Sequence, residues 1–322
     1  MDNQLHTPPS IKSSFGALYA GAAFFIWGIC PIFWEQLHSV PALEIVTHRV
    51  VWSPLFLLPV LFRQKRWGEV SATFRQPRAV LVLLLTTVLI SANWLIFIWA
   101  INNGYVLQTS IGYYMTPLVN VLLGMVFLRE RLRPLQVAAL VLAGAGVLYV
   151  TLDYGRFPWI ALSLGFTFGF YGLVHKLVAV SSITGLTMEM LLLCVPAVGY
   201  LVQLNAAGAG AFLHMGTRID LLLLATILFT AFPLLLFTMG VKAIHMSTLG
   251  FLQYFTPSCY FLLGVFYFHE PVSQAQIWTF VLIWIALFFY STDSILYYRF
   301  QKSILKRTIG GATPSLKGEP PQ

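Results

Sequence analysis

Residues 112–136 read GYYMTPLVNVLLGMVFLRERLRPLQ, and residues 252–276 read LQYFTPSCYFLLGVFYFHEPVSQAQ. At an offset of 140 positions the two stretches share eight residues. These are Tyr114, Thr116, Pro117, Leu122, Leu123, Gly124, Glu130 and Gln136 in the first copy, and Tyr254, Thr256, Pro257, Leu262, Leu263, Gly264, Glu270 and Gln276 in the second. Leucine is common in an apolar chain, but a shared Tyr, Pro, Gly, Glu and Gln in one register indicate an internal repeat.

The composition places the chain in a lipid bilayer. Of its 322 residues 58% are hydrophobic and 9% are charged, and the mean hydropathy is +0.79, whereas a soluble domain carries about 25% charged residues. The net charge of +8 is explained by membrane orientation, so no nucleic-acid partner is expected. The cysteines Cys30, Cys194 and Cys259 lie in apolar runs without CxxC spacing, which argues against a disulfide framework or a thiolate metal site.

Ten apolar runs are long enough to cross a membrane as helices, since about 20 residues span the hydrocarbon core. The predicted spans are 15–37, 41–62, 80–101, 105–128, 134–152, 158–178, 183–204, 219–242, 246–268 and 273–296. Five of them form a first repeat, 15–152, and five a second, 158–296, between terminal tails at 1–14 and 297–322. The sequence therefore predicts an all-α membrane protein with ten transmembrane helices in a 5+5 repeat bundle.

The positive charges predict the orientation. With the N-terminus in the cytoplasm, sixteen of the 19 Lys and Arg residues face the cytoplasm, Arg156 and Arg218 face the other side, and Arg49 lies within a span. Cytoplasmic loops carry the excess of Lys and Arg, so both termini are expected in the cytoplasm. Because each half has an odd number of spans, the second half must be inverted. Consistent with this, the connection 129–133 carries three arginines and its counterpart 269–273 carries none.

The repeat motif resembles that of the drug/metabolite transporter superfamily, in particular its EamA-repeat members of the RarD type. The motif is a Tyr-x-x-Pro core followed by a Gly, an aromatic residue and a Glu, here Tyr114–Pro117–Gly124–Phe127–Glu130 and Tyr254–Pro257–Gly264–Tyr267–Glu270. The RarD-like features are residues 26–28 with Pro31, 41–49 with Trp52 and Ser53, 93–104, and 130–136. The resemblance covers about residues 12–300 and implies an inverted 5+5 bundle that exports metabolites or drugs. The second half lacks an Arg at the position of Arg49, so the halves are not functionally equivalent.

Arg49 is the leading candidate for a substrate-binding residue. It lies roughly 12 Å from the start of its span, at 1.5 Å per residue, and an arginine near mid-membrane costs at least about 2.5–3.5 kcal/mol unless it faces the bundle interior or a wet cavity. Glu44 and His48 are one helical turn apart and share a face. Two interpretations remain open. Arg49 binds an anionic group while Glu44 or His48 exchanges protons, or Arg49 forms a structural ion pair and Glu44 is a solvated residue at the helix end.

Glu189 is a second carboxylate within a span. An unpaired carboxylate there is costly, so we expect it to be protonated or paired with Lys176, Lys242 or Arg49. A proton-coupling role and a structural ion pair both remain open.

Neutral polar and aromatic residues are expected to line the substrate path, in particular Asn93, Trp94, Tyr114 and Tyr254, whereas Trp34 is expected in the interfacial aromatic belt. Pro117 and Pro257 interrupt helical hydrogen bonding in the repeat helices. They are interpreted either as hinges or as static bends. Glu130 and Glu270 are expected to cap or bridge neighbouring helices at the two faces.

These features favour a secondary transporter over other membrane proteins. No Walker-type GxxxxGK[ST] sequence occurs, so direct ATP coupling is not expected and a proton gradient is the default energy source. No cofactor or metal is predicted. The expected cargo is a small organic metabolite or drug, amino-acid-like or amphenicol-like, exported by alternating access. The resemblance places the protein in a bacterial inner membrane, and homo-oligomerisation is left open. The alternatives are an intramembrane enzyme, disfavoured by the scattered histidines, and a non-transporting sensor or scaffold.

Overall fold

A computed structural model describes residues 11–103, 105–269 and 272–310. Helices account for every regular element in these described residues. They are α1 (Ile11–Glu35), α2 (Ala42–Arg63), α3 (Trp67–Phe74), α4 (Pro77–Asn102), α5 (Val106–Phe127), α6 (Pro134–Tyr154), α7 (Trp159–Leu177), α8 (Ser182–Ala206), α9 (Thr217–Ala243), α10 (Met246–Gln253), α11 (Phe255–Phe266) and α12 (Gln274–Gly310).

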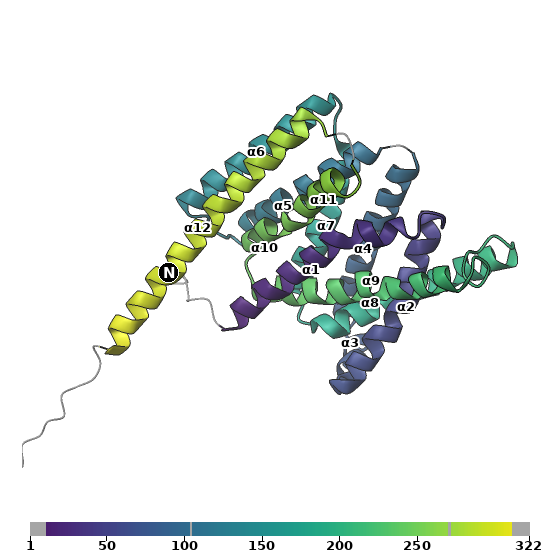
Figure 1. The fold of residues 1–322 in the computed structure, drawn as a ribbon. Coiled ribbons are helices and arrows are strands. Elements are labelled where there is room, and N and C mark those ends of the chain that lie inside the picture. The colour runs from purple at the N-terminus through teal and green to yellow at the C-terminus, as the bar shows by residue number, and fades with distance from the viewer. Residues whose placement is uncertain (1–10, 104, 270–271, 311–322) are drawn as a thin grey trace, which may run out of the picture.

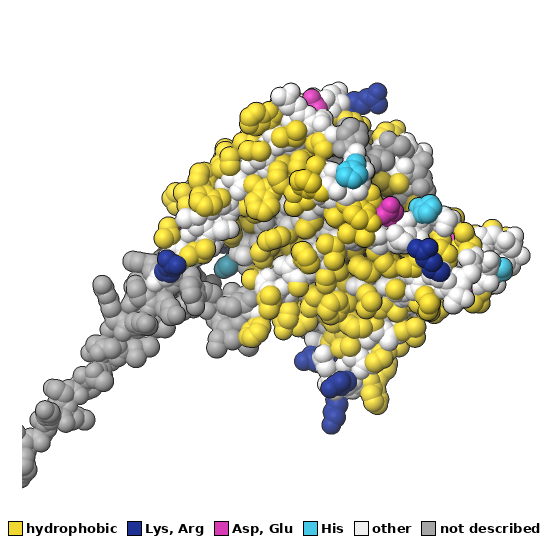
Figure 2. All heavy atoms as spheres, viewed as in Figure 1, with side chains coloured by type: hydrophobic (Ala, Val, Ile, Leu, Met, Phe, Trp, Pro, Cys, Tyr) yellow, Lys and Arg dark blue, Asp and Glu magenta, His cyan; other side chains and the backbone are white. Residues whose placement is uncertain are grey.

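The described helices form ten spans that are long and apolar enough to cross a membrane. The short helices α10 and α11 together form the ninth span. Hydrophobic side chains cover most of the face seen in Figure 2, and Lys and Arg side chains lie at its margins. The all-α membrane fold with ten spans is therefore confirmed.

Proline and glycine residues set several helix ends. Pro77 and Pro134 occupy the first turn of α4 and α6, where the missing N–H removes no intrahelical hydrogen bond. Gly155 ends α6 with a φ of 71°, a left-handed conformation that glycine adopts without steric cost.

Three features differ from the predicted helix boundaries. The short helix α3 was not predicted; it joins α2 to α4, and Glu69 on it accepts hydrogen bonds from Ser181 and Thr184 at the start of α8. The first helix begins before residue 15, and α12 continues to Gly310 instead of ending at 296. Residues 1–10 and 311–322 of the predicted tails lie outside the described residues.

The two repeat helices differ at their shared proline. The helix α5 is continuous through Pro117, whereas the corresponding span is broken at Tyr254 into α10 and α11, three residues before Pro257. Proline lacks the N–H that would bond the carbonyl four residues earlier, which here is that of Gln253 at the end of α10. The hinge role of both prolines stays a prediction.

Helix packing follows the sequence repeat. The 140-residue offset relates α1 to α7, α2 to α8, α4 to α9, α5 to α10 and α11, and α6 to α12. The contact of α1 with α9 therefore corresponds to that of α7 with α4. In the same way, the contact of α2 with α9 corresponds to that of α8 with α4. The contact of α5 with α7 likewise corresponds to α10 and α11 with α1. Three further contacts join counterparts directly: α2 with α8, α5 with α10, and α6 with α12. The last pair lies side by side along one edge of the bundle (Figure 1).

Candidate functional site

Arg49 projects from α2 toward α1, α4 and α9. Its Nε donates a hydrogen bond to Thr230 Oγ1 on α9 at 2.7 Å. Its guanidinium carbon lies 5.0 Å from the ring centre of Trp34 on α1 and 5.2 Å from that of Trp94 on α4. Both distances fall within the range of cation–π attraction. Arg49 therefore sits between two aromatic faces that hold its planar group in one orientation.

Two tyrosines lie within electrostatic range of Arg49. Tyr113 on α5 and Tyr260 on α11 interact electrostatically with Arg49, and their rings meet edge to face with centres 5.0 Å apart. The Arg49 site, defined as Arg49, Trp34, Trp94, Thr230, Tyr113 and Tyr260, thus collects side chains from α1, α2, α4, α5, α9 and α11.

In the described part of the chain, no carboxylate neutralises the charge of Arg49. Among the described residues, no Asp or Glu oxygen lies within ion-pair distance of its guanidinium. A guanidinium carries five N–H donors, and one is used here. The expected structural ion pair is therefore not formed within the described part of the chain, and the site can accept an anionic group.

Glu44 and His48 lie away from the Arg49 site. Glu44 Oε1 accepts a hydrogen bond from the backbone N–H of Ala211 at 2.7 Å, and His48 Nδ1 accepts one from Trp52 Nε1 at 3.0 Å. His48 Nε2 is 3.7 Å from Glu44 Oε1. Both residues are buried and line a pocket of about 240 Å³ against α8 and the 207–216 connection. Glu44 is thus not solvated, and the structure does not bring these two residues together with Arg49.

Of the other residues predicted to line the substrate path, Trp94 contacts Arg49 and Asn93, Tyr114 and Tyr254 have other partners. Asn93 uses its Nδ2 to bind Leu164 O and Thr167 Oγ1 on α7, both at 2.9 Å. Tyr114 and Tyr254 belong to a separate buried cluster with Phe251 and Tyr290.

Trp34 was not predicted as a neighbour of Arg49, but its ring covers the Arg49 guanidinium; its place in an interfacial belt stays a prediction. Sequence reasoning also missed the pairing of Tyr113 with Tyr260. The repeat offers a signal for it: the offset of 140 exchanges Tyr113 with Gln253 and Tyr260 with Asn120. Asn120 Nδ2 donates to Gln253 Oε1 at 2.5 Å. The two contacting pairs are therefore counterparts.

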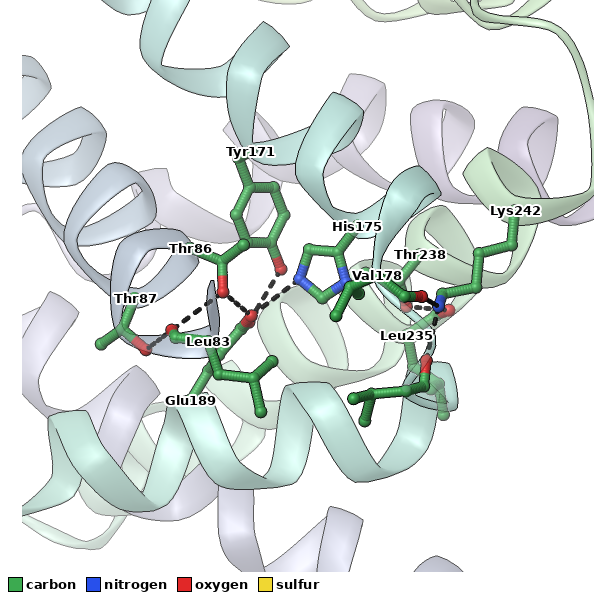
Figure 3. Close-up of polar contacts among 11 residues, drawn as sticks. Leu83, Thr86, Thr87, Tyr171, His175, Val178, Glu189, Leu235, Thr238 and Lys242 are labelled. Atoms are coloured by element: carbon green, nitrogen blue, oxygen red, sulfur yellow. Dashed lines mark hydrogen bonds and ion pairs between the residues drawn. The ribbon is translucent and has the colours of Figure 1, made fainter. Parts of the chain in front are cut away.

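Glu189 lies in a different buried group, shown in Figure 3. Its carboxylate contacts Thr86 on α4 and Tyr171 and His175 on α7. Of the two alternatives for Glu189, pairing with Lys176, Lys242 or Arg49 was wrong, because both lysines donate to backbone carbonyls and Arg49 donates to Thr230. Protonation of Glu189 stays a prediction. His175 and Tyr171 were not predicted. Their spacing of four residues on one helix face was the available signal.

Glu130 caps a helix, as predicted. Its two carboxylate oxygens accept hydrogen bonds from the backbone N–H groups of Met246 and Ser247, at 2.7 and 2.9 Å, at the start of α10. Burial alone would raise the pKa of Glu130, but hydrogen bonds from His245 and from these N–H groups outweigh burial and lower the pKa to about 2. Glu270, its counterpart, lies outside the described residues.

The described residues hold no group of three or more His, Cys, Asp or Glu side chains placed to bind a metal ion.

Comparison with known proteins identifies the family. The model of the EamA-like transporter family matches residues 14–152. Protein RarD of Salmonella typhi is 43% identical over 283 residues, covering 87% of this chain and 95% of its own length. The uncharacterized transporter YojE of Bacillus subtilis (strain 168) is 40% identical over 294 residues, covering 89% of this chain and 97% of its own.

A more distant relative is the chloramphenicol-sensitive protein RarD of Pseudomonas aeruginosa, 33% identical over 88% of this chain and 95% of its own. A solved crystal structure with 17% sequence identity has the same fold, with a TM-score of 0.68 over 86% of this chain and 96% of the other. The ten apolar helices and these relatives show that the chain belongs to the EamA-like transporter family, as a multi-pass membrane transporter of the RarD type.

Proposed function

We propose that this transporter moves small organic solutes that carry a carboxylate or a similar anionic group, and that it binds this group at Arg49. The observation that carries the proposal is a guanidinium inside the bundle with aromatic rings beside it and no carboxylate partner among the described residues. An unpaired charge within a membrane is costly and is typical of a functional site. The flanking rings suit an amphipathic solute, so an amino-acid-like carboxylate fits better than a neutral amphenicol.

We further propose that the two halves are inverted repeats and that transport proceeds by alternating access. Support comes from the helix contacts that the 140-residue offset exchanges and from two counterpart contacts, the Asn120–Gln253 hydrogen bond and the Tyr113–Tyr260 ring contact. Inverted repeats give a carrier two equivalent ways to close around one central site.

The remaining elements of the proposal follow from charge distribution and resemblance. The excess of Lys and Arg on one side favours cytoplasmic termini in an inner membrane, and the resemblance favours export. A proton gradient is the proposed energy source. Glu44, His48 and Glu189 are the candidates for the proton-binding group. Glu44 and His48 line the pocket at the 207–216 connection, and Glu189 contacts His175.

The test is flux in proteoliposomes, with amino acids, other small carboxylates and an amphenicol as solutes. Arg49→Gln is expected to lower carboxylate flux by about tenfold or more, because hydrogen bonds to charged groups contribute about 1.5–3 kcal/mol. Arg49→Lys keeps the charge but loses the planar stack on tryptophan, so it should give an intermediate rate. Arg75→Gln removes an exposed arginine and serves as the control. Wild-type flux in Arg49→Gln, at normal membrane abundance, would refute the proposal.

A further inference from the structure

Four side chains from three helices form a closed polar group that the substrate site does not use. They are Thr86 on α4, Tyr171 and His175 on α7, and Glu189 on α8. None is more than 1% exposed. Figure 3 shows the three other side chains pointing at the Glu189 carboxylate. Tyr171 donates its O–H to Oε2 at 3.1 Å, Thr86 donates its O–H to Oε1, and His175 Nε2 lies 2.7 Å from Oε1.

The partners of His175 limit how many protons the pair can hold. His175 Nδ1 is buried and has no hydrogen-bond partner. With a neutral imidazole that carries its proton on Nε2, an ionised Glu189 leaves one uncompensated negative charge in the bundle, which is costly without water. A proton added to a Glu189 oxygen makes the pair neutral, and the Tyr171 oxygen, 3.1 Å from Oε2, can accept it in a hydrogen bond. A further proton on His175 Nδ1 would leave a positive charge and a buried N–H without an acceptor. The geometry therefore favours a site that gains and loses a single proton.

The pair lies beside the contact that closes one face of the bundle. His175 precedes Lys176, whose Nζ donates to Val241 O at 3.0 Å and to Ile244 O at the carboxyl end of α9. Lys242 on α9 makes the reciprocal contacts, to Val178 O at 2.9 Å and Val180 O at 2.5 Å after α7. Each lysine thus caps the helix that carries the other, in the arrangement that helix carbonyl ends prefer. We call Lys176, Lys242 and these four carbonyls the lysine clasp.

We propose that the His175–Glu189 pair binds the coupling proton and that its occupancy controls the lysine clasp. This proposal rests on the proposed transport function. The clasp is closed around the neutral, proton-loaded pair. Loss of the proton to water leaves a negative charge that is stabilised only when water reaches it, so deprotonation favours separation of α7 from α9 and α8 at this face. The proton and the solute then bind at different places, Glu189 and Arg49, and each biases the same two-state closure.

Besides Thr86, Tyr171 and His175, no side chain in the described part of the chain lies within hydrogen-bond or ion-pair distance of Glu189. The remaining titratable groups on the helices packed against α7 and α8 are Glu44, His48, Arg49 and exposed Arg63 on α2; Glu69 on α3, paired with the adjacent Arg66; exposed Arg78 on α4; Tyr113 and Tyr114 on α5; Cys194 and Tyr200 on α8; and Arg218, Asp220 and Lys242 on α9. The carboxylate and imidazole of the pair are therefore the groups to test.

The first measurement is independent of transport. Infrared difference spectra of the purified full-length protein, recorded against pH in lipid nanodiscs, should contain a buried carboxyl signal that disappears in Glu189→Gln and changes in His175→Gln. Glu69→Gln, an isosteric change at a half-exposed carboxylate, should leave that signal in place. A titrating buried carboxyl signal that persists in Glu189→Gln would overturn the assignment, even if no tested solute is transported.

The second measurement distinguishes proton coupling from solute transport itself. In proteoliposomes Glu189→Gln should retain solute exchange at equal pH on both sides, and lose pH-gradient-driven accumulation by about tenfold or more, the usual range of coupling between sites. If neither exchange nor accumulation is seen in the wild type, the proposed function fails and the spectra still decide the proton site. If solute accumulation by the wild type does not depend on the pH gradient, the proposed coupling role of the His175–Glu189 pair is overturned without any variant. Full gradient-driven accumulation in Glu189→Gln overturns it as well.

Discussion

At the scale of single residues, the buried charges are distinguished by what surrounds them. Arg49 is held by rings and one hydroxyl, so its charge remains available to a ligand. Glu189 is surrounded by hydroxyl and imidazole groups, which is the basis of the proton site proposed above. Glu130 instead binds the amino end of a helix, where N–H groups and the helix dipole stabilise a negative charge. The same chemical group therefore has different surroundings at positions 130 and 189.

Glu130 provides a pH-dependent test of stability. Its pKa of about 2 lies below the ordinary value of 4.5, so the folded state favours the ionised form. The stabilisation is therefore present above about pH 4.5 and is lost as the pH falls through about 2. Glu130→Gln is expected to lower the free energy of unfolding by up to about 3 kcal/mol, at about 1.4 kcal/mol for each pKa unit.

Thermal unfolding in detergent checks this prediction. The difference in melting temperature between Glu130→Gln and the wild type should be constant from about pH 8 to 5 and should narrow below about pH 4.5. Glu35→Gln changes an exposed carboxylate at the end of α1 and should shift stability by no more than about 0.5 kcal/mol. Equal melting temperatures for Glu130→Gln and the wild type would show that the cap does not stabilise α10.

At the scale of elements, α5 and α10 cross at close range. A Cβ built on Gly250 would lie 2.5 Å from Pro117 O and 2.9 Å from Val121 Cγ2. The first of these atoms is backbone and cannot move without shifting α5. Small residues permit such close approach between membrane helices. Gly250 therefore sets the distance between the two repeat helices at the proline of the first copy.

Gly250→Ala should consequently destabilise the protein by about 1–3 kcal/mol through overpacking, despite the higher helix propensity of alanine, which is worth about 0.5–1 kcal/mol. The matched control is Gly144→Ala on α6, where an added Cβ meets nothing within 4 Å; it should be neutral or stabilising. Denaturation curves of the two variants in the same detergent measure the difference. Equal stability of the two would indicate that α5 and α10 separate without cost.

Hydropathy and length were enough to predict the ten spans, because lipid requires long apolar helices. The same criteria could not find α3, which has eight residues and lies outside the spans. They also could not find the break at Tyr254, because the corresponding helix of the first half contains the same proline, Pro117, and is unbroken. Arg49 could be predicted as a site residue because its insertion cost demands a partner. Thr230, 181 positions away in the sequence, could not be predicted, because that contact depends on how α2 packs against α9.

At the scale of the whole molecule, the counterpart pairs Asn120–Gln253 and Tyr113–Tyr260 join α5 to α10 and α11 on either side of the prolines. Seven residues separate the two pairs along each chain segment, or about 10 Å at 1.5 Å per residue. The pair nearer the lysine clasp is Asn120–Gln253, and Tyr113–Tyr260 lies at the Arg49 site. If the halves exchange conformations, each pair must open in one of the two states, so alternating access requires both to separate in every cycle.

Cross-linking tests this requirement. In a background without Cys30, Cys194 and Cys259, we expect a short thiol cross-linker to stop solute flux in both Asn120→Cys/Gln253→Cys and Tyr113→Cys/Tyr260→Cys. Each cross-link holds one side of the bundle closed. Because both sides must open in turn during transport, either cross-link alone should block the cycle. Because the cysteine substitutions alter the Arg49 site in the second pair, the relevant comparison is flux before and after linking, with recovery when a cleavable linker is cut.

The control pair is Val141→Cys/Ala145→Cys, one turn apart on the exposed side of α6, where a link joins no two helices and should leave flux unchanged. Inhibition of one interhelical pair alone would mean that only one side of the bundle opens, which is the behaviour of a channel-like gate. Full flux after complete linking of both pairs would show that α5 stays fixed to α10 and α11 throughout transport. The exchange of contacts between the two halves would then be a record of sequence duplication without a mechanical role.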